Sequence, residues 1–209
     1  MVFKNKRVVG SFRAFTRSPF WIGVTVIVSF GSGVIFNQYF SQIPNAYQET
    51  NSFSPSWKVC FTPTSRCLPF ILAAIKEAKK SVRVQGYSIT SPEIGAALRD
   101  AHRKGLKVIV IADKTQKTAQ YSQINSFLEA GIPVFIDAQP AIAHNKIIIV
   151  DQSIVLTGSY NWTKSAELRN AENLLLIRDK ELIRQYEDNF QRRLLKSKRH
   201  SPVSSNTSK

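Results

Sequence analysis

Two polar residues at the start of an aliphatic run have the types and the spacing of a phosphate-handling pair. His144 and Lys146 lie two residues apart at the start of HNKIIIVD, which predicts a β-strand over residues 145–151. Side chains two positions apart on a strand project from the same face, so the imidazole and the ammonium should lie side by side. An imidazole can attack phosphorus while an ammonium offsets the charge on the phosphoryl oxygens. The pair therefore indicates phosphoryl chemistry at a strand end.

The residues around this pair resemble one enzyme family. The pattern H-x-K-x-x-x-x-D, matched by His144, Lys146 and Asp151, is the motif of the phospholipase D superfamily. Alone it is only moderately specific, but two further family elements follow it. These are a G-S-x-N element, matched by Gly158, Ser159 and Asn161, and a downstream acid, matched by Glu172. VCFTP and GYSIT also look like segments of the small single-motif bacterial endonucleases of this superfamily, so the likeness covers residues 57–190.

The resemblance implies a catalytic role for five of these residues. His144 would be the nucleophile that forms a covalent phosphohistidine intermediate. Glu172 would accept a hydrogen bond from the other imidazole nitrogen and so fix the tautomer. Lys146 and Asn161 would hold the non-bridging phosphate oxygens, and Ser159 would form a hydrogen bond nearby.

Two matched residues would support the site without reacting. Gly158 belongs to the supporting motif, and Asp151 would be structural rather than a catalytic base. The scheme requires no metal and no cofactor, and acidic residues near the motif are too few for a two-metal site.

The sequence holds one copy of the motif. Phosphohistidine chemistry needs a nucleophile on one side of phosphorus and a general acid behind the leaving oxygen, and no second H-x-K occurs in the chain. In the family two motifs face each other across a twofold axis, and single-motif chains achieve this by homodimerisation. The resemblance therefore implies an obligate homodimer in which each subunit supplies one His144 to a shared cleft.

Alternating strand and helix patterns surround the motif. Strands are predicted over residues 57–63, 81–89, 106–113, 133–137, 145–151, 153–159 and 171–179, and helices over 67–80, 91–105, 120–130 and 181–196. Ser91, Pro92 and Gly105 have the positions of an N-cap, a first helical residue and a C-cap. The pattern predicts an α/β/α sandwich with a central mixed β-sheet. The resemblance makes this fold phospholipase D-like.

Cys60 and Cys67 are the only cysteines, too few for a disulfide scaffold or a four-ligand zinc site. If Cys60 lies on a strand and Cys67 on the following helix, one disulfide is geometrically possible in an oxidising compartment. Two buried thiols fit the sequence equally well, so both interpretations stay open.

The net charge of +15 comes from 29 basic and 14 acidic residues. Much of it lies in residues 1–20 and 191–209, which contain basic residues and no acids. A basic tail, predicted to be disordered over residues 198–209, favours polyanions such as nucleic acid or anionic lipid headgroups. A solvated terminus without a partner is the alternative.

Residues 18–48 carry no charge, and residues 20–40 are mostly apolar. A helix over this apolar run, at about 1.5 Å per residue, would be roughly 30 Å long, the thickness of a bilayer core. The sequence predicts a basic cytoplasmic N-terminus (1–19), a transmembrane signal anchor (20–40), a linker (41–56) and a catalytic domain (57–197). The positive-inside rule places this domain on the periplasmic side of the inner membrane. A cleaved signal peptide, which would make the protein secreted, is the alternative.

Three functions are weighed for this chain. The resemblance favours a DNA or RNA endonuclease with little sequence preference. The second is a membrane phospholipid hydrolase that cleaves phosphatidyl headgroups or cardiolipin and uses the anchor to reach its substrate. The third, a membrane-tethered protein that binds nucleic acid without turnover, fits the complete set of matched residues least well.

Overall fold

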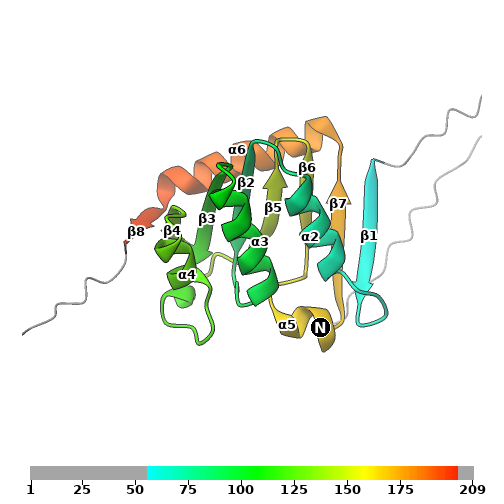
Figure 1. Ribbon diagram of the computed structural model, residues 1–209, viewed down its shortest axis with the longest axis horizontal. Helices are drawn as coiled ribbons and strands as arrows, with labels where there is room; N and C mark the ends of the chain where they lie inside the picture. The colour runs from blue at the N-terminus through cyan, green and yellow to red at the C-terminus, as the bar shows by residue number, and fades with distance from the viewer. Residues whose placement is uncertain (1–55, 202–209) are drawn as a thin grey trace, which may run out of the picture. The chain divides into compact units, whose positions relative to one another are not determined.

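The computed structural model describes residues 56–201. The predicted basic N-terminus, the membrane segment and the linker up to residue 55 lie outside the described residues, as does the chain beyond residue 201. Within residues 56–201, no helix is long and apolar enough to cross a membrane. This part of the chain is built on an eight-stranded sheet (Figure 1).

The sheet is mixed, as the sequence predicts. Its strands are β1 (Trp57–Thr62), β2 (Ser81–Gly86), β3 (Lys107–Asp113), β4 (Val134–Asp137), β5 (Lys146–Val150), β6 (Ile154–Gly158), β7 (Glu172–Ile177) and β8 (Lys198–His200). Their order across the sheet is β1-β7-β6-β5-β2-β3-β4-β8. β2, β3 and β4 are parallel neighbours, and all other neighbours are antiparallel. Each predicted strand occurs at its expected place.

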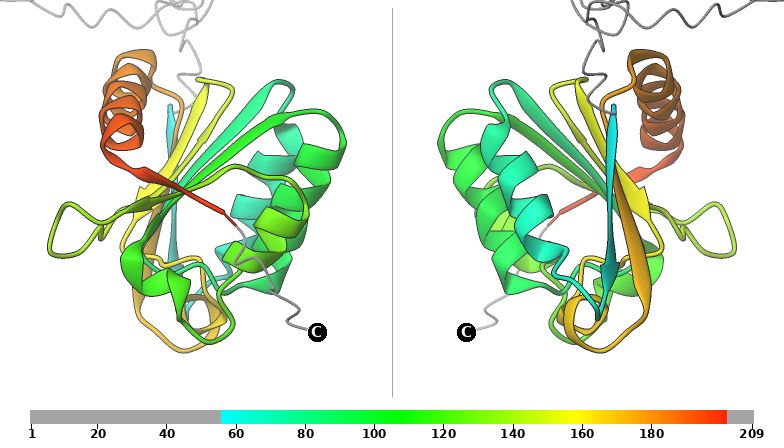
Figure 2. Two further views of the ribbon diagram at one scale, coloured as in Figure 1. Left: turned by 90° about the vertical axis from the view of Figure 1, so that its left-hand side faces the viewer. Right: turned by 90° about the vertical axis from the view of Figure 1, so that its right-hand side faces the viewer.

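Helices cover both faces of the sheet, which confirms the predicted three layers. On one face lie α2 (Leu68–Glu77), α3 (Pro92–Arg103) and α4 (Ile124–Glu129), while α6 (Lys180–Lys196) crosses the other (Figure 2). Ile71, Leu98 and Phe127 are buried in the first core, and Ile149 and Phe190 in the second. The short helix α5 (Lys164–Leu168) and the 3-10 turn η2 (Lys114–Lys117) lie in connections between strands.

Local chemistry explains where two of the helices begin. α3 begins after Ser91, whose hydroxyl accepts the backbone N–H of Ile94, so the predicted N-cap is confirmed. α4 begins at Ile124, later than the predicted residue 120. Tyr121 has a φ of 66°, a left-handed conformation that a right-handed helix cannot include.

The C-terminal strand β8 corrects the predicted disordered tail. Lys198 pairs with Ile136 and His200 with Val134, so the first three residues of the predicted tail form an edge strand beside β4. Backbone hydrogen bonds make this strand, and its short polar sequence has no apolar alternation that could reveal it. Charged side chains on an edge strand also discourage pairing with further strands.

A disulfide joins Cys60 of β1 to Cys67, the residue before α2. This settles the choice that the sequence leaves open. Both cysteines are buried, and a carboxylate reinforces the junction: Oε2 of Glu167 accepts the backbone N–H groups of Cys67 and Leu68. These donors are the free N–H groups at the start of a helix, where a negative charge is favourable.

Candidate active site

The predicted site residues meet at one end of the sheet, called the site end below. β5 begins at Lys146, β6 ends at the predicted glycine of the G-S-x-N element, and β7 begins at Glu172. These neighbouring strands are antiparallel, so the start of β5, the end of β6 and the start of β7 share one edge. His144 precedes β5 directly, and Ser159 and Asn161 follow β6.

His144 and Lys146 are in direct contact. Nζ of Lys146 lies 2.9 Å from Nδ1 of His144 and 2.9 Å from the carbonyl oxygen of the same residue. Lys146 is only 6% exposed. Burial lowers its pKa, and the negative charge of Glu172 opposes that shift. The sequence-based expectation that the imidazole and the ammonium lie side by side is confirmed.

The carboxylate of Glu172 interacts with the loop beyond β6. Its Oε2 accepts a hydrogen bond from Oγ of Ser159 at 2.5 Å, and its Oε1 accepts one from Nδ2 of Asn170 at 2.9 Å. Among the hydrogen bonds of residues 56–201, none joins Glu172 to His144. The expected contact is therefore absent, since Lys146 lies at Nδ1 of the imidazole and Ser159 lies at the carboxylate.

Gly158 supports the site through its backbone. Its φ is +155°, and a Cβ built there would lie 2.2 Å from the carbonyl oxygen of Asn173 on β7. Only glycine allows the chain to approach β7 this closely. This close approach brings Ser159 to the start of β7, where its Oγ also accepts the backbone N–H of Asn173 at 3.1 Å.

Asn161 is held by its buried neighbour Trp162. The indole Nε1–H of Trp162 donates to the carbonyl oxygen of Gln85 at 3.0 Å. The backbone N–H of Trp162 donates to the carbonyl oxygen of Ser88 at 3.1 Å. Oδ1 of Asn161 is buried and has no hydrogen-bond partner within residues 56–201. The amide therefore keeps unused hydrogen-bonding capacity at the site end.

Asp151 lies at the opposite end of β5 from Lys146. Its carboxylate accepts the backbone N–H groups of Lys79, Lys80 and Ser81 at 2.6–2.8 Å. Burial alone would raise the pKa of Asp151, but these hydrogen bonds outweigh it and the pKa is lowered. Asp151 and Gln152 have φ of 51° and 56°, the conformation of a tight hairpin turn. This geometry agrees with the structural role that the resemblance implies.

Two further residues contact the segment that carries His144, and sequence reasoning assigned a role to neither. Asp113, at the end of β3, is fully buried, and its carboxylate accepts the backbone N–H of Ala143 at 2.7 Å. Burial would raise the pKa of Asp113, but hydrogen bonds from Ala143 and Thr115 lower it overall. The ring of Tyr87, just after β2, lies against His144. The GYSIT segment was the only sequence signal for Tyr87.

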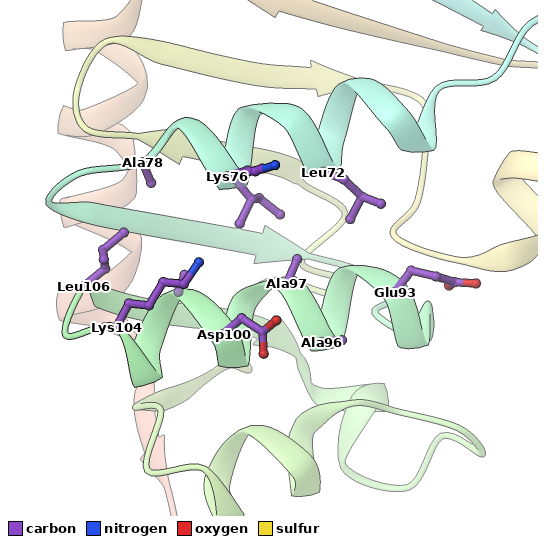
Figure 3. A pocket seen from close by; sticks show the side chains of 11 residues that line it. Leu72, Lys76, Ala78, Glu93, Ala96, Ala97, Asp100, Lys104 and Leu106 are labelled. Carbon is purple, nitrogen blue, oxygen red and sulfur yellow. The ribbon is translucent and has the colours of Figure 1, made fainter.

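A groove elsewhere on the described domain lacks the combination of residue types found at the site end. A groove of about 420 Å³ separates α2 and α3, and Leu72, Ala97 and Leu106 are among the residues that line it (Figure 3). Its charged residues, Lys76, Glu93, Asp100 and Lys104, surround an apolar floor, and no histidine lines it. Within residues 56–201, no three or more His, Cys, Asp or Glu side chains converge to hold a metal ion.

Comparison with known proteins agrees with this geometry. Residues 71–194 match the family model described as cardiolipin synthase, PLD-like domain. A protein from Rickettsia bellii named phospholipase D is 36% identical over 191 residues, which cover 90% of this chain and 94% of that protein. The chain belongs to the phospholipase D superfamily.

Two other superfamily members show the range of its relatives. The mitochondrial cardiolipin hydrolase of Mus musculus is 35% identical over 139 residues, which cover 66% of this chain and 63% of that protein. Nuc from Salmonella typhimurium, a phospholipase D family member of known structure, is 33% identical with a TM-score of 0.65. The match covers 70% of this chain and 98% of Nuc. Within the phospholipase D superfamily, the chain is of the Nuc type, and it is a phosphodiesterase.

Proposed function

We propose that this phosphodiesterase is a nuclease that cleaves DNA or RNA with little sequence preference and without a resident metal. The observation that carries the proposal is the contact between His144 and Lys146 at the site end, beside Ser159, Asn161 and Glu172. A nitrogen of the imidazole attacks phosphorus as the bond to the leaving oxygen breaks, which gives a phosphohistidine. Water then attacks the same phosphorus, and the N–P bond breaks to release the product and the free imidazole.

The basic and polar side chains of the site handle the phosphate. The ammonium of Lys146, which now contacts the imidazole, moves to the non-bridging oxygens and offsets their charge. The amide nitrogen Nδ2 of Asn161, which donates no hydrogen bond among the described residues, donates to the same oxygens. The hydrogen-bonded Ser159 and Glu172 form the base of the phosphate site. When Lys146 moves to the phosphate, Nδ1 of His144 loses its present partner and can carry a proton.

A proton for the leaving oxygen must come from a second imidazole. The chain has only two histidines besides His144. His102 lies at the end of α3, beside the start of β3, and His200 pairs with Val134 at the start of β4. His102 is thus at the end of the sheet opposite the site, and His200 lies on the edge strand β8, which β2, β3 and β4 separate from β5. We therefore propose a homodimer in which His144 of the partner subunit donates this proton and later activates water.

The charge at the site end favours a polyanionic substrate. The connections at this end (63–67, 87–91, 114–123, 138–145 and 159–171) carry the exposed basic residues Arg66, Lys114, Lys117, Lys164 and Arg169. The one acid in these connections, Glu167, is buried against Tyr160 and the start of α2. Exposed lysines and arginines around a phosphodiester site bind a nucleic-acid backbone through its phosphates.

Hydrolysis of an anionic phospholipid is the second candidate. Relatives of the chain are named phospholipase D and mitochondrial cardiolipin hydrolase. The predicted membrane segment over residues 20–40 would keep the domain near a bilayer. The positive charge at the site end suits a phospholipid headgroup as well as a nucleic acid, so substrate assays must separate the two.

We propose an extracytoplasmic location for the catalytic domain. The support comes from the disulfide between Cys60 and Cys67, since such bonds persist in oxidising compartments. Basic residues before the apolar segment 20–40 would keep the N-terminus in the cytoplasm and export the domain as a single-pass inner-membrane protein. Cleavage after that segment would instead release it as a secreted enzyme.

One set of assays tests the function. The full chain, purified in mild detergent, is given plasmid DNA, RNA, cardiolipin and phosphatidylcholine in the presence of EDTA. We expect DNA and RNA cleavage that persists in EDTA, is lost in His144→Ala and remains in the matched control His102→Ala. Cleavage of lipid alone would establish the second candidate, and loss of all activity in EDTA would refute the mechanism without metal.

A further inference from the structure

The aromatic ring of Tyr87 touches both residues of the catalytic pair. Its centroid lies 4.6 Å from that of the His144 imidazole, with the two planes inclined at 60°. The ammonium nitrogen of Lys146 lies 5.4 Å from the same centroid, over the ring. One phenol ring therefore contacts the proposed nucleophile and the proposed phosphate-binding cation together.

Backbone contacts fix the position of the residue that carries this ring. The N–H of Tyr87 donates to the carbonyl oxygen of Asn145, the residue between His144 and Lys146, at 3.0 Å. Before it, Gly86 packs against Ile89 and Trp162, and a Cβ at Gly86 would lie within 3 Å of both side chains. The end of β2 is thus joined to the start of β5, which places the Cα of Tyr87 beside the catalytic pair.

The phenol hydroxyl of Tyr87 forms no hydrogen bond with the catalytic pair, whereas the ring contacts both residues. Among the hydrogen bonds of residues 56–201, none uses the hydroxyl of Tyr87. The contacts that the side chain makes with the catalytic pair run through its aromatic carbon atoms. Any role in positioning the pair therefore belongs to the ring face and edge rather than to an O–H donor.

We propose that the ring of Tyr87 is a positioning platform that fixes the rotamer of His144 and keeps the ammonium of Lys146 beside it. The proposal rests on the phosphodiesterase mechanism above, in which His144 must point at phosphorus. A tilted contact between two rings restricts rotation of the imidazole. The negative face of the phenol ring attracts the ammonium and offsets part of the hydration that Lys146 loses by burial. Tyr87 itself exchanges no proton and forms no bond to substrate.

The kinetic test compares Tyr87→Phe, which keeps the ring, with Tyr87→Leu, which removes it, in the full chain. Tyr121→Leu is the matched control, because Tyr121 is 75% exposed and makes no side-chain contact with the catalytic pair. For a small aryl phosphodiester we expect kcat of Tyr87→Leu to fall by about 10- to 100-fold with little change in KM, as misplacement of a reacting group does. Tyr87→Phe should recover most of that loss, and the control should match wild type.

An NMR measurement tests the contact without relying on activity. The chain contains three histidines, so its imidazole Cε1–H groups give three signals per subunit, and His144→Ala identifies one of them. The field of the Tyr87 ring should displace the His144 signal from the region of the other two. Tyr87→Leu should move that signal alone, and Tyr87→Phe should leave it near its wild-type position.

The outcomes separate failure of this inference from failure of the proposed function. Wild-type kcat in Tyr87→Leu, an unmoved His144 signal, or equal losses in the Phe and Leu variants would each overturn the platform role. Equal losses would show that the hydroxyl is the part that matters. Full activity of His144→Ala would instead refute the proposed function, whereas the NMR contact between Tyr87 and His144 would stand.

Discussion

The ammonium of Lys146 lies at hydrogen-bond distance from Nδ1 of His144, so the proposed phosphate-binding cation is in contact with the proposed nucleophile before any substrate arrives. Burial lowers the pKa of Lys146 below the ordinary lysine value of 10.5. The ammonium therefore loses its proton at a lower pH than a solvated lysine does. The response of the enzyme to pH should therefore depend on this pair.

Activity should fall at alkaline pH as Lys146 deprotonates, and the midpoint of that fall should lie below pH 10.5. Lys146→Arg keeps a positive charge across this range, so its alkaline limb should move upward even though its overall activity is reduced. The measurement is kcat/KM against pH with a small aryl phosphodiester. An unchanged alkaline limb in the arginine variant would assign the titration to another group.

Coexpression of wild-type and His144→Ala chains should show that two subunits share one site. If both copies of His144 are needed, an equal mixture of the two chains should retain about one quarter of the wild-type activity, because only wild-type homodimers work. Differently tagged chains allow each dimer to be purified and assayed separately. Activity proportional to the wild-type fraction, with an active mixed dimer, would show that each subunit has its own site.

Removal of the Asp113 carboxylate should weaken both the fold and the segment that carries His144. Asp113→Ala leaves the buried N–H of Ala143 unpaired, which costs about 1–3 kcal/mol in the free energy of unfolding. The exposed Asp100→Ala is the control and should change stability by less than about 0.5 kcal/mol. Urea denaturation measures both variants.

The same carboxylate predicts a response to acid. The pKa of Asp113 is lowered in the folded protein, so its contribution to stability is complete above the ordinary value of 3.8 and is lost as pH falls through the lowered pKa. In Asp113→Asn this acid-dependent part should disappear. Identical slopes of stability against pH in the two proteins between pH 2 and 5 would contradict the assignment.

Reduction of the disulfide should destabilise the junction between β1 and α2. Cys60 and Cys67 are separated by seven positions, and closing a loop of this size lowers the entropy of the unfolded chain by an amount worth about 2–3 kcal/mol. A Cys60→Ser/Cys67→Ser double variant should lose this stability, and a reducing agent should destabilise wild type but not the variant. Equal unfolding midpoints with and without reducing agent in wild type would refute this.

The strands, the principal helices and the meeting of the motif residues were predictable because each rests on local pattern. Alternation and apolar runs mark β2 to β7, and the antiparallel pairing of β5 with β6 follows from the short connection at Asp151 and Gln152. The pairing of β6 with β7 spans the longer connection 159–171. Once these strands are neighbours, the segments that carry Lys146 and Glu172 must share one edge of the sheet.

The features that escaped prediction depend on contacts between segments far apart in the sequence. β8 exists through backbone pairing with β4, which its basic sequence does not signal. Asp113 and Tyr87 act on the His144 segment only because β3 and β2 end at the same edge as β5 begins. The expected bond between Glu172 and His144 is replaced by contacts whose choice depends on side-chain geometry at the site end.

The direction of β1 sets the end of the sheet at which the chain enters the domain. The chain enters the sheet at Trp57, which pairs with Ile177, and reaches the site end at Thr62, which pairs with Glu172. The residues before Trp57 thus join the domain at its rear, one strand length from the chemistry. If residues 20–40 hold the domain at a membrane, as proposed, the tether attaches at the end of the sheet opposite the chemistry.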